Sequence, residues 1–173
     1  MNSSTIDGEG HLGNDQLAIT NAVGGLIDAN VTSAILEIDP PGAAGSFLNL
    51  GTARASNGGI LRFSGNGYGA FDNTGGTISA LNGSEVRLIY GASISGGSLT
   101  TAGTGVVAVD SFGSGSLSDL TNSGSVLVRN GAQLNLSGTI TDDGTITLAS
   151  GGSATQLIMA NGTVLSGTGA VIL

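Results

Sequence analysis

Apolar residues recur along this chain in short triplets of the form apolar–x–apolar. Eight such triplets follow one another at steps of 19, 25, 25, 21, 19, 20 and 25 residues, measured between their first positions. Alternation with a period of two residues is typical of a β-strand that buries one face. The pattern therefore predicts one strand that returns in every repeat. The triplets occupy residues 17–19, 36–38, 61–63, 86–88, 107–109, 126–128, 146–148 and 171–173.

Two further apolar elements accompany most triplets. A Gly–Ser/Thr–apolar element lies upstream, at residues 76–78, 97–99, 115–117, 138–140 and 162–164. A looser apolar pair such as Leu134 with Leu136 follows several triplets, with Ile94 and Phe112 as reduced versions. Three short strands per repeat, separated by Gly, Asn, Asp and Ser, indicate a β-solenoid rather than a β-sandwich. We therefore predict an all-β parallel β-helix of about eight coils of 19–25 residues, with three short strands per coil.

The repeat runs through the whole chain, so residues 1–173 are expected to form one solenoid domain, itself a fragment of a longer repeat protein. Residues 1–13 precede the first triplet and are expected to be irregular or frayed. The chain has 32 glycines in 173 residues, which opposes long helices because each glycine costs about 1 kcal/mol in a helix interior. Glycine and asparagine tolerate positive φ, so we place them at corners between strands, for example at 56–59 and 129–132.

The alternation also predicts which side chains of the triplet strands face outward. The central triplet positions form one outward column, which begins at Ala18. In this column Glu37 and Arg62 are expected to be neighbours on adjacent coils. The residues before each triplet form a second column, in which Glu85 is expected to offset Arg62 and Arg87. Exposed ion pairs contribute only about 0–1 kcal/mol each, so we interpret them as ordinary surface pairing.

Several outward positions are apolar instead of polar. An apolar patch on a face that has little charge is a candidate contact surface for a neighbouring domain or a second copy of the chain. Ordinary β-propensity on an exposed sheet is the alternative interpretation. The candidate contact face consists of Ile35, Ile60, Val106, Leu127 and Ile172.

Charge excludes several classes of partner. The chain has four arginines and no lysine against 12 acidic residues, which gives a net charge of −8. Binding to nucleic acid or to an anionic membrane surface needs clustered positive charge, so neither is expected. No run approaches the roughly 18 apolar residues of a membrane-spanning helix. The absence of cysteine excludes disulfides and thiolate metal sites.

The motifs that suggest chemistry lack the context that this chemistry needs. Residues 8–13 match G-x-G-x-x-G, but no βαβ unit surrounds them, so no cofactor is expected. His11 is the only histidine, which excludes a histidine-based metal cluster and a Ser-His-Asp triad. The adjacent acids Asp142 and Asp143 are interpreted as a turn, with weak calcium coordination as the alternative. We therefore assign no catalytic residue.

Aromatic side chains that stack on sugar rings are scarce. Tyr68 and Tyr90 are the only tyrosines, and the chain contains no tryptophan. Solenoid enzymes that cleave polysaccharides use paired carboxylates, often with calcium, and 142–143 is the one adjacent acidic pair here. A carbohydrate-binding groove is therefore kept as a minor alternative.

Three segments carry a family resemblance: residues 120–128 (LTNSGSVLV), 131–140 (GAQLNLSGTI) and 143–148 (DGTITL). They are similar to the repeats of large bacterial surface exoproteins, namely the β-helical passengers of autotransporters and the filamentous-haemagglutinin-like adhesins. The resemblance implies a right-handed, three-sided parallel β-helix, export, and a place at the cell surface. It transfers no functional residue, since the family shares no site motif.

Together these observations favour a non-catalytic structural or adhesive segment of a secreted or cell-surface bacterial protein, acting as a rigid stalk or contact surface. The first alternative is a fragment of a β-helical polysaccharide-degrading or carbohydrate-binding protein. The second is a self-assembling solenoid, because open solenoid ends expose unpaired strand edges, and the last triplet, 171–173, is an uncapped apolar strand. The ligand or host surface stays open, and a leader is expected outside this chain.

Overall fold

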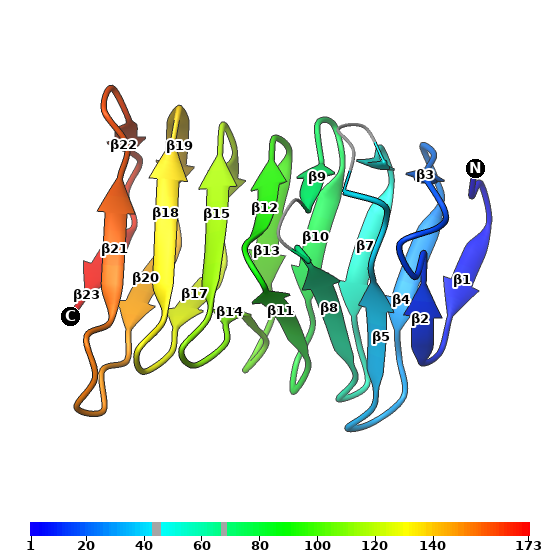
Figure 1. The fold of residues 1–173 in the computed structure, drawn as a ribbon, viewed down its shortest axis with the longest axis horizontal. Helices are drawn as coiled ribbons and strands as arrows, with labels where there is room; N and C mark the ends of the chain where they lie inside the picture. The colour runs from blue at the N-terminus through cyan, green and yellow to red at the C-terminus, as the bar shows by residue number, and fades with distance from the viewer. Residues whose placement is uncertain (43–45, 67–68) are drawn as a thin grey trace.

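The computed structural model describes residues 1–42, 46–66 and 69–173. Within these residues the chain forms 23 short β-strands and no helix. An inner strand of each sheet pairs in parallel with the strands three places before and after it in the sequence, and a strand at the end of a sheet pairs with one of them. The chain therefore winds with one strand in each of three sheets, and its coils stack into a rod with the two termini at opposite ends (Figure 1). The predicted parallel solenoid with three strands per coil is confirmed.

The three sheets are named by their order of appearance in the chain. The first sheet contains β1 (Thr5–Asp7), β4 (Leu26–Ala29), β7 (Thr52–Ala55), β10 (Thr77–Ala80), β13 (Ser98–Thr101), β16 (Thr121–Asn122), β19 (Thr139–Asp142) and β22 (Val164–Ser166). The second contains β2 (Gly10–Leu12), β5 (Ile35–Ile38), β8 (Ile60–Ser64), β11 (Glu85–Ile89), β14 (Val106–Val109), β17 (Ser125–Val128), β20 (Thr145–Leu148) and β23 (Ala170–Ile172). The third contains β3 (Ile19–Asn21), β6 (Phe47–Asn49), β9 (Ala70–Asp72), β12 (Ala92–Ser95), β15 (Ser114–Ser118), β18 (Gln133–Ser137) and β21 (Gln156–Met159).

The number of complete coils follows from the shortest sheet. The third sheet holds seven strands, so the described part of the chain makes seven complete coils, and β22 and β23 begin the next turn. We number the coils from the N-terminus, so that coil 4 consists of β10, β11 and β12.

The first coil differs from the prediction. Its second-sheet strand is β2, which contains His11 and pairs with β5. The first predicted triplet does not form a second-sheet strand, because Leu17 is 55% exposed and Ile19 begins β3 of the third sheet. His11 therefore takes the place in the outward column that the pattern gave to Ala18. Residues 1–13, expected to be irregular or frayed, contain β1 and β2. The alternation missed β2 because this strand has only one apolar residue.

The inward faces of the three sheets form one core of Leu, Ile, Val, Ala and Phe side chains. Phe47 and Phe71 from the third sheet and Phe63 from the second are completely buried. Their rings pack edge to face with centroids 4.9–5.8 Å apart, which contributes about 0.5–1.5 kcal/mol per pair beyond the buried area. Each coil buries its apolar side chains against the coils before and after it, so stability is a sum over neighbouring coils.

Residues with positive φ turn the chain between the sheets. At one predicted corner Asn57 and Gly58 have φ of 51° and 75°, and at the other Gly131 has φ of 74°. Gly97 meets a second requirement, because a Cβ atom there would lie 2.1 Å from the carbonyl oxygen of Asn73 on the preceding coil. Glycine thus provides both the turn and the close approach of successive coils.

Candidate contact surface

The five residues of the candidate contact face lie on the outer side of the second sheet, in two separate columns. The first column contains Ile35, Ile60 and Val106, and the second contains Leu127 and Ile172. Ile35 and Ile60 are direct neighbours, but Glu85 lies between Ile60 and Val106 and pairs with both. Ile172 is 48% exposed, whereas the other four are half-buried. The structure therefore brings two of the five residues together and does not join all of them into one apolar patch.

Charged side chains on the same sheet pair with one another. The predicted pair forms, with the Arg62 guanidinium donating to Glu37. One carboxylate oxygen of Glu85 accepts from Arg87 at 2.9 Å, as expected. Its other oxygen accepts from Arg129 rather than from Arg62. The sequence pattern missed Arg129 because this residue lies after the triplet, two coils further along the rod.

Arg129 connects three successive coils. From coil 6 it donates to Asp110 Oδ1 of coil 5 at 2.5 Å and to Glu85 of coil 4. We call Glu85, Arg87, Asp110 and Arg129 the charged cluster. Burial acts to lower the pKa of Arg87, but the hydrogen bond and negative charge of Glu85, with the charge of Asp110, outweigh it and raise this pKa. Several charges in one network hold each other more effectively than an isolated exposed pair, so the cluster fixes coils 4 to 6 relative to one another.

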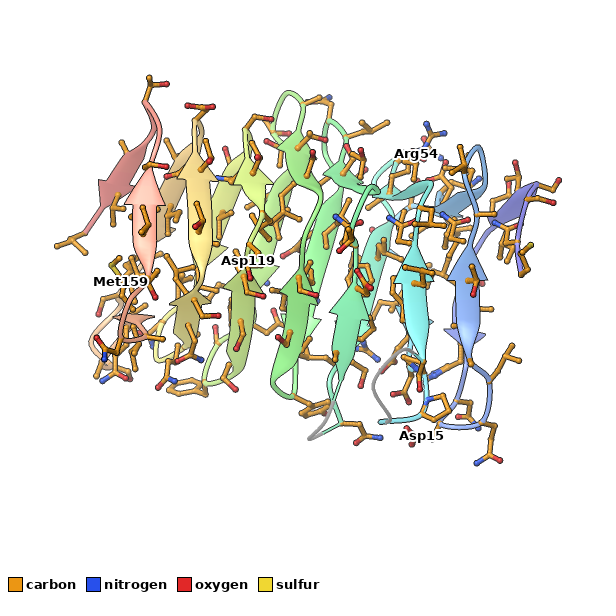
Figure 2. All side chains as sticks on the ribbon, turned by 90° about the horizontal axis from the view of Figure 1, so that it is seen from above. Asp15, Arg54, Asp119 and Met159 are labelled. Carbon is orange, nitrogen blue, oxygen red and sulfur yellow. The ribbon has the colours of Figure 1, made fainter. Side chains whose placement is uncertain are left out.

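A separate ion pair lies on the first sheet. Arg54 of β7 donates through Nε to Asp28 Oδ2 at 2.8 Å, and the hydroxyl of Ser56 donates to Asp28 Oδ1 at 2.8 Å. Figure 2 shows Arg54 at one long edge of the rod and Asp15 at the opposite edge.

All four arginines of the chain pair with a carboxylate on another coil.

A row of asparagines that the repeat did not predict stacks at the ends of the third-sheet strands. The side-chain amide of Asn2 donates to Asn21 Oδ1 at 2.8 Å, that of Asn21 to Asn49 Oδ1 at 2.7 Å, and that of Asn49 to Asn73 Oδ1 at 2.7 Å. We call these four residues the asparagine ladder. The last three are completely buried. Each inner amide both accepts and donates along the row, so the buried polar groups are satisfied.

The signal for the ladder is present in the sequence. An apolar–x–Asn pattern recurs at 19–21, 47–49 and 71–73, where the apolar side chain is buried in the core. Positive φ, the predicted reason for asparagine at corners, does not account for these residues. Asn57 has that conformation, whereas the ladder residues do not. The amide stack, rather than the backbone, explains asparagine at these positions.

The adjacent acids Asp142 and Asp143 lie in different environments. Asp142 is 4% exposed, and its Oδ1 accepts from the amide of Asn122 at 2.7 Å and from the backbone N–H of Gly144 at 3.3 Å. Asp143 is exposed, and its Oδ1 accepts from the backbone N–H of Thr168 at 2.9 Å. The two carboxylates therefore do not converge on one point. Among the described residues, no group of three or more His, Asp and Glu is placed to hold a metal ion.

Asp39 is a buried carboxyl group among other acids. It follows β5, is 8% exposed, and has one side-chain oxygen without a hydrogen-bond partner. Burial, together with the negative charges of Asp15 and Glu37, raises its pKa, while the charge of His11 and a hydrogen bond with Ser64 act to lower it. The folded protein therefore favours the protonated form of this group more than the unfolded chain does.

A cavity of about 650 Å³ lies at the corner between the second and third sheets. Tyr90 and Phe112 line it, with 68% and 74% of their surfaces exposed. The repeat predicts equivalent positions for Phe112 and Ile94, each as a reduced version of the apolar pair that follows a triplet. Ile94 is buried, but Phe112 lies on the connection before β15 and points outward. The other tyrosine named from the sequence, Tyr68, lies outside the described residues.

Comparison with known proteins adds no relative. No family model matches the chain, and neither a curated protein nor a solved structure matches it significantly. Over residues 1–42, 46–66 and 69–173, no helix is long and apolar enough to cross a membrane.

Proposed function

We propose that this chain is a non-catalytic structural or adhesive segment of a secreted or cell-surface bacterial protein, in which it acts as a rigid stalk or contact surface. The observation that carries the proposal is the axial direction of the polar contacts. The asparagine ladder and the ion pairs of Arg54, Arg62 and Arg129 all join one coil to another. Amide, guanidinium and carboxylate groups, which an enzyme uses in a cleft, hold successive coils in register here.

The solenoid architecture supports a stalk. Each added coil lengthens the rod by about 4.8 Å, the distance between neighbouring strands, while the cross-section stays the same. The similarity of its repeats to those of autotransporter passengers and filamentous-haemagglutinin-like adhesins supports export and display. This similarity also supports a bacterial source.

Antibodies raised against the purified chain test its location. We expect them to label intact cells of the source organism or to detect the protein in cell-free culture medium. An antibody against a cytosolic protein serves as the control for cell integrity. A signal that appears only after lysis would overturn surface display and secretion.

The non-catalytic role has its own test. We expect no release of new chain ends when acidic and neutral polysaccharides are incubated with the protein, with and without calcium. Turnover of any of them would establish the enzyme alternative. In that case Asp142→Asn and Asp143→Asn would be compared, because the two carboxylates lie in different environments.

Lateral contact through the second sheet is tested by changing Ile60 and Val106 to Thr. Both side chains face outward and are half-buried. Isoleucine, valine and threonine are all β-branched, so the two changes keep the strand-favouring shape and lower the apolar area of the outer face. We expect light scattering to show association of the parent chain and less association of the double variant. Monomers in both samples would contradict a lateral contact.

A further inference from the structure

The corner between the second and third sheets is recessed at coil 4. The connection between β11 and β12 contains two residues, Tyr90 and Gly91, whereas those in coils 5 and 6 contain four each, residues 110–113 and 129–132. Tyr90 of this shorter connection lines the cavity of about 650 Å³, together with residues of both longer connections. The cavity extends along the rod axis as far as Gln156 of coil 7.

Two exposed aromatic side chains line this cavity, Tyr90 and Phe112. The other three aromatic residues in the described ranges are in the core. Tyr90 and Phe112 have positive φ, 52° and 59°. Bulky residues seldom adopt this conformation, which costs on the order of 1–3 kcal/mol. The surface therefore holds two rings at one place at a conformational cost, which points to a use for them.

Coil 6 holds the Phe112 ring in position. A Cβ atom at Gly131 would lie 2.6 Å from Cδ1 and 2.7 Å from Cε1 of Phe112. The ring therefore lies directly against the Gly131 backbone, in space that any side chain there would occupy. Because 74% of Phe112 stays exposed, the supported ring offers a flat apolar surface to the solvent.

A row of neutral polar side chains runs beside the two rings. Ser114, Gln133 and Gln156 pair in register across β15, β18 and β21, so neighbouring members are about 4.8 Å apart. The Gln133 amide donates to Asn135 Oδ1 at 2.8 Å. This bond orients the amide and leaves its carbonyl oxygen and its second N–H available to a ligand.

The charges at the cavity are already paired. Arg62 binds Glu37, and Asp110 binds Arg129. The chain as a whole carries a net charge of −8, which repels anions. These charges favour a neutral ligand over an acidic one.

We infer that this cavity binds a neutral oligosaccharide along the rod axis. Sugar rings have a face of C–H groups that stacks on an aromatic ring, and hydroxyl groups that both donate and accept hydrogen bonds. Tyr90 and Phe112 supply the rings, and the row at Ser114, Gln133 and Gln156 meets the hydroxyls. Concave sites that combine apolar walls with a few placed polar groups are typical of small-ligand binding. The inference rests on the proposed function only in taking the coils as a fixed scaffold.

An NMR titration tests the binding. The probes are hexasaccharides of β-1,4-linked glucose, α-1,4-linked glucose, β-1,4-linked mannose and β-1,4-linked N-acetylglucosamine, with oligogalacturonate as the acidic comparator. We expect at least one neutral probe to shift backbone amide signals in 89–92, 110–114 and 131–133. We expect oligogalacturonate to leave these signals unchanged.

Substitutions at the two rings then test the mechanism. We expect Tyr90→Ala and Phe112→Ala each to weaken binding about tenfold or more. Phe112→Leu keeps an apolar side chain but removes the flat ring, so it should weaken binding as Phe112→Ala does. Phe112→Tyr keeps a flat ring and should bind with the affinity of the parent chain. Val23→Ala changes another exposed apolar residue, outside the cavity, and should leave binding unchanged. Thermal unfolding of each variant checks that the fold is retained.

Three outcomes would overturn the inference: no shift with any neutral probe, tighter binding of oligogalacturonate, or full affinity in Phe112→Leu. None of them bears on the proposed stalk, because the stalk is tested by the location of the protein on cells. Surface labelling without oligosaccharide binding would keep the stalk and remove the binding site.

Discussion

Asn49 lies in the middle of the asparagine ladder, and its amide bonds to Asn21 on one side and to Asn73 on the other. It also donates to the carbonyl oxygen of Thr77 at 3.2 Å. A buried polar group that loses its partner costs more free energy than the bond itself contributes. The two inner members of the ladder, Asn21 and Asn49, therefore depend on a neighbour on either side, and through them one coil depends on the next.

Replacing Asn49 with Ala tests this dependence. The change removes the donor to Asn73 Oδ1, while Asn21 keeps two backbone carbonyl acceptors. We expect the free energy of unfolding, measured by urea denaturation, to fall by about 1–3 kcal/mol. The control is Asn161→Ala on an exposed turn, which should change it by less than about 0.5 kcal/mol. Equal stability of the two variants would show that the ladder contributes nothing.

Asp39 gives a prediction about pH. Its pKa is raised in the folded protein, so the folded state binds this proton more tightly than the unfolded chain. Asp39 therefore contributes to the free energy of unfolding while it is protonated, at acidic pH. This contribution is lost as pH rises through the raised pKa and the carboxyl group becomes charged. We expect Asp39→Asn to raise the melting temperature near neutral pH, and to raise it less at pH values below the carboxyl range.

The control for this experiment is Glu9→Gln, which removes one negative charge from an exposed position. It should change the melting temperature little at either pH. If Asp39→Asn destabilises the protein at neutral pH, the buried carboxylate is compensated by a contact other than those of Ser64 and His11.

At the scale of one coil and its corners, two glycines with positive φ differ in their surroundings. Gly83 has φ of 74° and open space around it, whereas Gly97 has φ of 64° and faces Asn73 on the preceding coil. Gly83→Ala should cost only the backbone strain, about 1–2 kcal/mol. Gly97→Ala should also push two coils apart and cost about 3 kcal/mol or more. Denaturant unfolding measures both, and equal losses would mean that the approach of the coils is not tight.

Strand positions were largely predictable from the sequence. The triplets from 36–38 onward overlap successive second-sheet strands, because a half-buried strand must alternate. The strand at Gly10–Leu12 was missed because polar and small residues occupy its other positions. Apolar alternation thus predicts the strands inside the repeat better than the strand of the first coil.

Contacts between coils were harder to predict. The steps between triplets vary from 19 to 25 residues, so the partner of a side chain on the next coil depends on the length of each connection. Glu37 and Arg62 were paired correctly because both are inside triplets. Arg129 and Phe112 lie on connections, where alternation gives no direction, so their roles in the charged cluster and the cavity required the structure.

In the whole molecule, stability is the sum of contacts between neighbouring coils, and the coils at the ends have fewer of them. We expect amide hydrogens of β22 and β23 to exchange faster than those of β11 and β14. β22 and β23 each have one neighbouring strand, whereas β11 and β14 each have two. Hydrogen exchange under native conditions measures this difference. One common exchange rate along the rod would indicate global rather than coil-by-coil opening.

The hydrogen bonds between coils run along the rod, and the chain termini lie at its opposite ends (Figure 1). A pulling force on the termini therefore acts on the coils one after another, beginning at an end. A coil of 19–25 residues spans about 4.8 Å in the folded rod, but roughly 60–90 Å once it is stretched out. Under tension the protein is expected to lengthen in steps, so that it absorbs mechanical work while its two ends stay connected.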